Sequence, residues 1–158
     1  MRSKDFTTSR ERKEFALDQK LVDLRRVARV VAGGRRFSFR ATVVVGSRLG
    51  QVGIGTAKAS DTSMAIQKAA RQAEKNSVKI PLTKARSIPF DVRGKFASAK
   101  VIIRPAIEGH GLVAGSSVRT VLDFAGVKNA SAKILSHTKN KISNARAALE
   151  ALKKLKTI

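Results

Sequence analysis

The fold is decided by the stretch VAGGRRFSFRATVVVG, residues 31–46, which joins a glycine turn to a long strand. From residue 36 onward, polar and apolar side chains alternate. This period of two predicts a β-strand with one buried face and one solvent-exposed face. The face expected in the core carries Phe37, Phe39, Ala41, Val43 and Val45, and the face expected in solvent carries Arg36, Ser38, Arg40 and Thr42.

The residues on either side of this stretch predict a small antiparallel sheet. Leu21–Val31 is rich in β-branched side chains and predicts a strand, preceded by a short helical turn. Gly33 and Gly34 provide the turn of a hairpin, and Gln51–Ala57 predicts a third strand after a second turn. A helix with Ser60 as its expected N-cap follows, and its apolar stripe is expected to cover the sheet: Ile66, Ala69, Ala70 and Ala73.

Positive charge dominates the composition. The chain of 158 residues has 33 Lys and Arg against 11 Asp and Glu, a net charge of +22 at pH 7. No acidic residue occurs between Asp23 and Asp61. Such an excess opposes a compact state unless a polyanion neutralises it, and nucleic acid is the commonest polyanion; an anionic membrane surface is the alternative. We interpret the cations of this interval as phosphate contacts: Arg25, Arg26, Arg29, Arg35, Arg36, Arg40, Arg48 and Lys58.

The second half of the chain predicts a separate α/β domain. Pro81 and Pro89 bracket a basic stretch that we interpret as a linker. The patterns predict strands over Ile88–Phe96, Ala99–Arg104 and Ala132–Leu135, and helices over 116–125 and Lys141–Lys156. The expected division is a flexible tail over residues 1–16, a first domain over 17–79, a linker over 80–89 and a second domain over 90–158.

The composition also argues against several classes of function. The chain has no cysteine, and neither His110 nor His137 lies in a metal-binding spacing, so we expect no metal and no cofactor. No apolar run approaches the ~18 residues of a membrane span. No set of nucleophile, base and orienting residue is recognisable, so we expect no catalytic residues.

Six short motifs follow one another along the chain. They are GRRFSF (34–39), VVVG (43–46), GQVGIG (50–55), AIQKA (65–69), RPAIEGHG (104–111) and VLDFAGV (121–127). In this order and with this charge, they resemble the bacterial type of the small-subunit ribosomal protein S5 family. The resemblance extends over nearly the whole chain.

The resemblance implies an α+β protein built from two small α/β domains. The first would be similar to a double-stranded-RNA-binding fold, with three antiparallel strands and a helix. The second would be similar to the second domain of the S5 family, a fold shared with the GHMP kinases. The implied function is that of a structural constituent of the small ribosomal subunit in the cytoplasm. It would bind small-subunit ribosomal RNA, contact small-subunit proteins four and eight, and support translational accuracy, without being an enzyme, a membrane protein or a homo-oligomer.

The resemblance also implies roles for individual residues. The hairpin around Val30–Arg36 matches the family loop that inserts into RNA, so Gly33 and Gly34 join the cations named above as RNA contacts. Three further residues are assigned to RNA: Lys68, Arg104 and His110. The region that faces protein four is matched by Gly109, Gly111, Gly115 and Arg119.

Two alternatives to the ribosomal role remain open at this point. The glycine-rich loop Glu108–Gly115 precedes a predicted helix and is similar to the phosphate loop of GHMP kinases. A phosphotransferase is therefore one alternative, and turnover of ATP with a small alcohol would support it. The other is a free RNA chaperone or membrane-surface binder, which stoichiometric recovery in washed small subunits would exclude.

Overall fold

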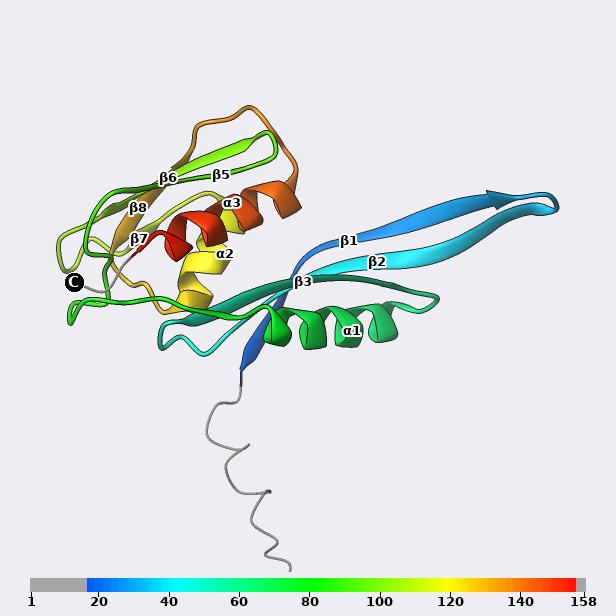
Figure 1. The fold of residues 1–158 in the computed structure, drawn as a ribbon, viewed down its shortest axis with the longest axis horizontal. Coiled ribbons are helices and arrows are strands. Elements are labelled where there is room, and N and C mark those ends of the chain that lie inside the picture. Colours follow the sequence, from blue (N-terminus) through cyan, green and yellow to red (C-terminus); the bar gives the residue numbers. More distant parts are fainter. Residues whose placement is uncertain (1–16, 156–158) are drawn as a thin grey trace, which may run out of the picture.

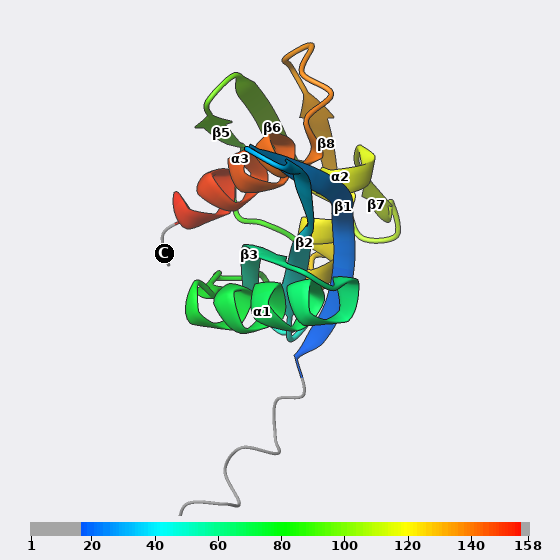
Figure 2. The ribbon, with the colours of Figure 1, turned by 90° about the vertical axis from the view of Figure 1, so that its right-hand side faces the viewer.

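The computed structural model describes residues 17–155, so the predicted tail over residues 1–16 and the end of the last predicted helix lie outside the described residues. The first half forms an antiparallel sheet of order β1-β2-β3-β4, with helix α1 against one face (Figures 1 and 2). Its elements are β1 (Asp18–Val31), β2 (Gly34–Gly46), β3 (Gln51–Ala59), α1 (Thr62–Lys75) and β4 (Val78–Lys79).

Two predictions for this half were wrong. A helical turn was expected just before Leu21, but residues 18–20 are already part of β1. The strand begins at Asp18, which pairs with Gly46 of β2. The long second strand provides a partner for this segment, which therefore stays extended. The sheet also has a fourth strand, β4, of only two residues, which pairs with Gln51 and Val52. The three-strand prediction missed it because two residues carry no periodicity.

Helix α1 packs closely on the sheet through small residues. Ala65, Ala69 and Ala73 are fully buried against the face of β2 that carries Val43 and Val45. A Cβ atom on Gly55 would overlap the backbone carbonyl oxygen of Ala69, so the helix backbone rests directly on β3. Glycine is required there by this close approach.

The start of α1 also differs from the prediction. The N-cap is Asp61 rather than Ser60, and the helix proper begins at Thr62. The hydroxyl of Ser63 donates a hydrogen bond to the Asp61 carboxylate. This hydrogen bond stabilises the charged form and lowers the pKa of Asp61 from its ordinary value.

The second half is a mixed sheet with two helices on one face. Its strand order is β5-β6-β8-β7, in which β7 runs parallel to β8 and the other pairs are antiparallel. Several details differ from the predictions. β5 begins only at Val92, and the glycine-rich loop contains a two-residue strand. β8 begins at Ala130 rather than Ala132, and α3 ends at Lys153 rather than Lys156. The elements are β5 (Val92–Phe96), β6 (Ala99–Pro105), β7 (Leu112–Val113), α2 (Ser116–Ala125), β8 (Ala130–Ile134) and α3 (Lys141–Lys153).

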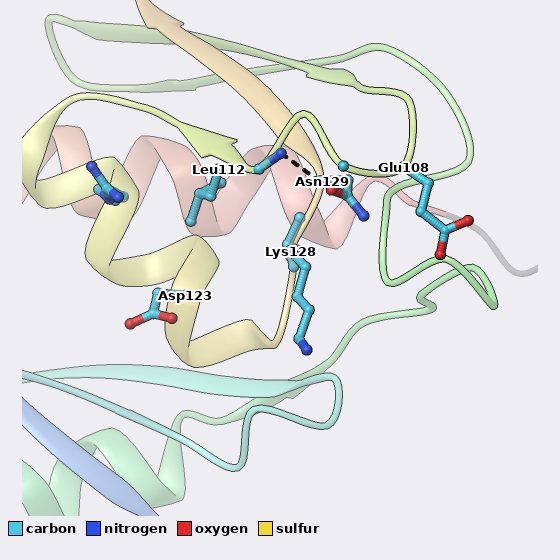
Figure 3. A pocket seen from close by; sticks show the side chains of 9 residues that line it. Glu108, Leu112, Asp123, Lys128 and Asn129 are labelled. Atoms are coloured by element: carbon cyan, nitrogen blue, oxygen red, sulfur yellow. Dashed lines mark hydrogen bonds between the residues drawn. The ribbon is translucent and has the colours of Figure 1, made fainter.

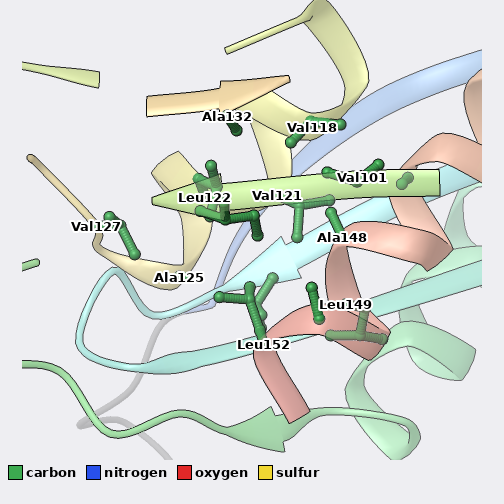
Figure 4. Close-up of a cluster of buried hydrophobic side chains, with 14 of the residues drawn as sticks. Val101, Val118, Val121, Leu122, Ala125, Val127, Ala132, Ala148, Leu149 and Leu152 are labelled. Carbon is green, nitrogen blue, oxygen red and sulfur yellow. The ribbon is translucent and has the colours of Figure 1, made fainter. Parts of the chain in front are cut away.

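Helices α2 and α3 lie between the two sheets, so the two halves share one core (Figures 2 and 4). Val121, Leu122 and Leu152 from the helices pack in the same cluster as Val44 of β2. Thr42, on the face of β2 that was expected in solvent, is only 1% exposed. That prediction was wrong for the second half of β2, because alternation cannot reveal that a second layer covers the polar face.

Backbone contacts join the halves at the turn between β2 and β3. Arg48 N–H donates to the carbonyl oxygen of Phe124 at 3.0 Å, and Gly50 N–H donates to that of Ala125 at 2.9 Å. Side chains of the predicted linker are also packed: Ile80 is 6% exposed and Ile88 is 2% exposed. The segment over residues 80–89 is therefore a structured connection between the halves.

Candidate nucleic-acid interface

The hairpin of β1 and β2 projects far beyond the rest of the protein (Figure 1). Strand β3 pairs with β2 only as far as Phe39, opposite Ala59. From there to the turn at Gly33, β1 and β2 have only each other as neighbours in the sheet. We call residues 25–40 the basic arm. Its pairing is continuous, so the arm is a regular two-stranded ribbon.

One face of the basic arm collects arginines. Because Ala41 and Val43 pack against α1, the even-numbered residues of β2 lie on the opposite face. The register places Arg36 opposite Arg29 and Arg40 opposite Arg25, so these four side chains share that face. Lys58 of β3 lies next to Arg40 and extends the row. We call this set the arginine face.

Little in the described part of the protein neutralises the arginine face. Like charges directly opposite each other in a sheet destabilise it. The single carboxylate that pairs there is Asp23, which accepts from Arg25 Nε at 2.9 Å. Within residues 17–155, Arg29 and Arg36 have no ion pair, and both side chains are exposed. The arm thus presents aligned donors that an external anion can satisfy.

Phe37 does not belong to the core, which corrects the prediction. Its side chain is 51% exposed, and the guanidinium carbon of Arg26 lies 4.5 Å from the centroid of its ring. Phe39, two residues closer to the body, packs against the cluster under α1 as predicted. The difference arises because the arm extends past the end of α1, where no described element covers it. Near the tip, Val30 is 76% exposed.

The remaining RNA contacts predicted in the first half are distributed over different surfaces. Gly33 and Gly34 lie at the tip, where a Cβ atom would meet no other atom within 4 Å. Arg48 is paired with Asp18 at 3.1 Å and stacks over Phe124, so it contributes to the contact between the halves. Lys68 is exposed on the outer side of α1, on the face of the sheet opposite to the arginine face.

The predicted contacts of the second half lie away from the arm. Arg104, at the end of β6, pairs with Asp91 at 3.2 Å, and both side chains are more than half exposed. His110 is exposed in the glycine-rich loop, with its ring nitrogen Nδ1 3.4 Å from the carbonyl oxygen of Gly111. The structure therefore brings the cations of the arginine face together and leaves these two on other surfaces. The register places Arg26 and Arg35 on the opposite face of the arm.

The glycine-rich loop forms one side of a pocket of about 610 Å³. Three of the residues assigned to the contact with protein four line it, namely Gly109, Gly111 and Arg119, whereas Gly115 lies outside the lining as the N-cap of α2. Asn129 holds the loop by accepting a hydrogen bond from Gly111 N–H at 3.2 Å (Figure 3). Four polar lining residues that the sequence did not assign to this site come from the glycine-rich loop, from α2 and from the loop that follows α2: Glu108, Asp123, Lys128 and Asn129.

Residues 17–155 lack two further classes of feature, a metal site and a membrane-spanning helix. No group of three or more His, Cys, Asp or Glu side chains lies close enough together to hold a metal ion. No helix in this part of the chain has the length and apolar character needed to cross a membrane.

Comparison with known proteins identifies the family. The family model for the N-terminal domain of ribosomal protein S5 matches residues 17–81, and the model for its C-terminal domain matches residues 94–158. The protein uS5c of Cyanophora paradoxa, a small ribosomal subunit protein, is 50% identical over 139 residues, which cover 88% of this chain and 82% of the relative. The small ribosomal subunit protein uS5 of Synechococcus elongatus is 49% identical over 148 residues, 94% of this chain and 82% of the relative. The small ribosomal subunit protein uS5 of Nostoc punctiforme is 46% identical over 155 residues, which cover 98% of this chain and 88% of the relative. The chain therefore belongs to the ribosomal protein S5 family, whose members are structural proteins of the ribosome and not enzymes.

Proposed function

We propose that this protein is a structural component of the small ribosomal subunit and binds its ribosomal RNA through the arginine face of the basic arm. The observation that carries the proposal is the strand register, which places Arg29 opposite Arg36 and Arg25 opposite Arg40. Both pairs lie on a ribbon that projects from the body (Figure 1). Among the described residues, only Arg25 of these four arginines has an ion pair, with Asp23.

The chemistry of arginine explains why phosphate is the proposed ligand. Each guanidinium is a planar, permanently charged fork that can form two parallel hydrogen bonds to phosphate oxygens. Residues opposite each other in an antiparallel pair have Cα atoms only about 4.5 to 5.5 Å apart. Two opposed arginines can therefore share one phosphate, and the repulsion between them becomes attraction to the ligand. An RNA backbone provides such phosphates in series.

We further propose that the pocket below the glycine-rich loop faces small-subunit protein four. Gly109, Gly111 and Arg119 lie there together, and positive φ values at Gly109 and Gly111 favour glycine in the loop. Contact with small-subunit protein eight is part of the same proposal. Self-repulsion at a net charge of +22 opposes association of the chain with a second copy.

The finer fold assignment is also a proposal. An antiparallel three-strand core followed by a helix on one face is the order expected for a double-stranded-RNA-binding-like domain, and β1, β2, β3 and α1 follow it. The glycine-rich loop ahead of α2 supports the likeness of the second half to the GHMP-kinase fold. Membership of the S5 family argues against the phosphotransferase alternative.

Titration of the protein with small-subunit ribosomal RNA tests the proposed function. The double variant Arg29→Gln/Arg36→Gln removes one arginine pair from an exposed part of the arm. We expect a loss of affinity for small-subunit ribosomal RNA of about tenfold or more, because each lost phosphate contact is worth of the order of 1 kcal/mol. The matched control Arg71→Gln/Lys75→Gln removes the same charge from exposed positions of α1. Equal affinities of the two variants would contradict the proposal.

A further inference from the structure

The outer face of the second sheet is a second basic surface, separate from the arm. Successive residues of β5, β6 and β8 point alternately toward α2 and α3 and away from them. Val92, Val101 and Ile103 point inward and are buried. No other described element covers the outward face (Figures 1 and 2). Five exposed cations lie on it: Arg93, Lys95, Lys100, Arg104 and Lys133.

The strand register builds a pocket into this surface. Ile102 pairs with Arg93 on one side and with Lys133 on the other. Although it points outward, Ile102 is only 7% exposed, because long basic side chains flank it and their aliphatic stems can cover apolar surface. These three residues line a pocket of about 370 Å³ together with Arg104, Ser131 and Leu135.

The pocket combines an apolar floor with a cationic rim. Ile102 forms the floor, and Leu135, which is 55% exposed, provides an apolar wall. Three cations surround these two side chains. Among the described residues, the one ion pair at this pocket joins Arg104 to Asp91. Both partners are more than half exposed, so the pair is weak and a phosphate can replace Asp91 as the partner of Arg104.

We propose that this pocket binds an unpaired nucleotide of RNA. The base would pack on Ile102 and Leu135, and the neighbouring phosphate would lie among Arg93, Arg104 and Lys133. Single-stranded RNA offers this combination, because its bases are free to leave the stack and its backbone carries one negative charge per nucleotide. The excess of cations over carboxylates on this face favours RNA over a protein partner. This inference rests on the proposed function. It adds a second RNA-binding surface, on the opposite side of the protein core from the first sheet.

The first experiment measures charge. The full-length variant Arg93→Gln/Lys133→Gln is titrated with a short single-stranded oligouridylate beside the wild type and the α1 control Arg71→Gln/Lys75→Gln. We expect an affinity loss of about tenfold for the pocket variant and a salt dependence reduced by about one to two in log–log slope. The α1 control should lose less than about threefold, as expected for cations that make no direct contact. Equal losses in the two variants would overturn the proposal.

The second experiment separates a nucleotide from a bare anion. Leu135→Ser removes the apolar wall without changing charge. It should weaken binding of the oligouridylate severalfold and leave the affinity for inorganic polyphosphate unchanged. If Leu135→Ser leaves oligouridylate affinity unchanged, or weakens both ligands equally, no base occupies the pocket and the proposal fails.

The arm variant Arg29→Gln/Arg36→Gln keeps the two RNA surfaces distinguishable. A defect in the arm variant alone would overturn the second surface and leave the proposed function standing. A defect in the pocket variant alone would support the second surface and count against the arm. If the pocket variant kept its RNA affinity but failed to associate with another small-subunit protein, this face would be a protein interface, and the proposal would be overturned.

Discussion

Arg29 and Arg36 illustrate how a residue can serve binding at the expense of folding. They lie opposite each other on the basic arm and have no ion pair within residues 17–155. Opposed like charges in a sheet destabilise the free protein by a few tenths of a kcal/mol to about 1 kcal/mol. The same arrangement offers two guanidinium forks to one phosphate. Stability and RNA affinity should therefore respond to these residues in opposite directions.

The single substitution Arg29→Gln tests this opposition. We expect the free energy of unfolding to rise by about 0.2 to 1 kcal/mol at low salt, because the repulsion with Arg36 is removed. Affinity for ribosomal RNA should fall in the same variant. Urea denaturation followed by circular dichroism measures the first effect, and an RNA titration measures the second. Arg71→Gln on α1 serves as the control, and a loss of stability in Arg29→Gln would contradict the account.

Phe37 and Phe39 provide a second test at the residue scale. Phe39→Ala should cost about 2 kcal/mol of stability, since its ring packs against the cluster under α1. Phe37→Ala should cost less than about 1 kcal/mol, because the ring is half exposed and mainly contacts Arg26. Chemical denaturation of both variants measures the difference. Equal costs would mean that the arm is packed against the body in solution.

These two phenylalanines also show what the sequence could and could not predict about the site. The alternation correctly predicted the strand and the arginines that share its polar face. It could not separate Phe37 from Phe39, because periodicity does not state where the covering helix ends. The same limit explains Thr42, which the pattern placed in solvent and the second half covers. The charge of the arm, by contrast, was evident from the absence of acids between Asp23 and Asp61.

At the scale of the secondary-structure elements, glycines in the strands determine how closely the helices pack on the sheets. A Cβ atom on Gly55 of β3 would overlap the carbonyl oxygen of Ala69 in α1, and one on Gly94 of β5 would overlap that of Ala147 in α3. Both helices therefore approach the sheet backbone more closely than any side chain permits. Gly53 of β3 is constrained in the same way, because a Cβ atom there would overlap the carbonyl oxygen of Ala73 in α1.

Gly55→Ala measures how rigid this packing is. The added methyl group must displace the backbone of α1, so we expect a loss of about 3 kcal/mol or more in the free energy of unfolding. Gly33→Ala at the tip of the arm is the matched control, because its Cβ has no neighbour within 4 Å. That variant should remain within about 0.5 kcal/mol of the wild type. A similar cost for the two substitutions, measured by thermal or urea denaturation, would contradict the close packing of α1.

Short elements were beyond the reach of the sequence. Strands β4 and β7 contain two residues each, too few for an alternating pattern to be recognised. Their existence depends on long-range pairing with β3 and β8. The long elements were predicted well, including the end of α2, where Gly126 adopts a left-handed φ of 89°. Local signals of this kind are encoded within a few residues, whereas pairing partners are not.

At the scale of the whole molecule, the described residues 17–155 form a single packed body from which the arm projects. Helices α2 and α3 cover the inner faces of both sheets, so each half completes the core of the other. This arrangement holds the base of the arm in a fixed direction relative to the second sheet and the glycine-rich loop. Two domains were predicted from the prolines at 81 and 89, but sequence patterns did not reveal this shared core. A rigid body suits a protein that sets the positions of several charged surfaces at once.

The salt dependence of binding to small-subunit ribosomal RNA tests the central claim most directly. The wild type is compared with a variant in which Arg25, Arg29, Arg36 and Arg40 are all replaced by glutamine, and with Arg71→Gln/Lys75→Gln. Each phosphate contact contributes about 0.7 to 0.9 to the slope of log affinity against log salt concentration. The account predicts that the arm variant has a slope shallower than that of the wild type by about three, while the control stays within about one. Equal slopes for the wild type and the arm variant would show that the arginine face does not engage the RNA backbone.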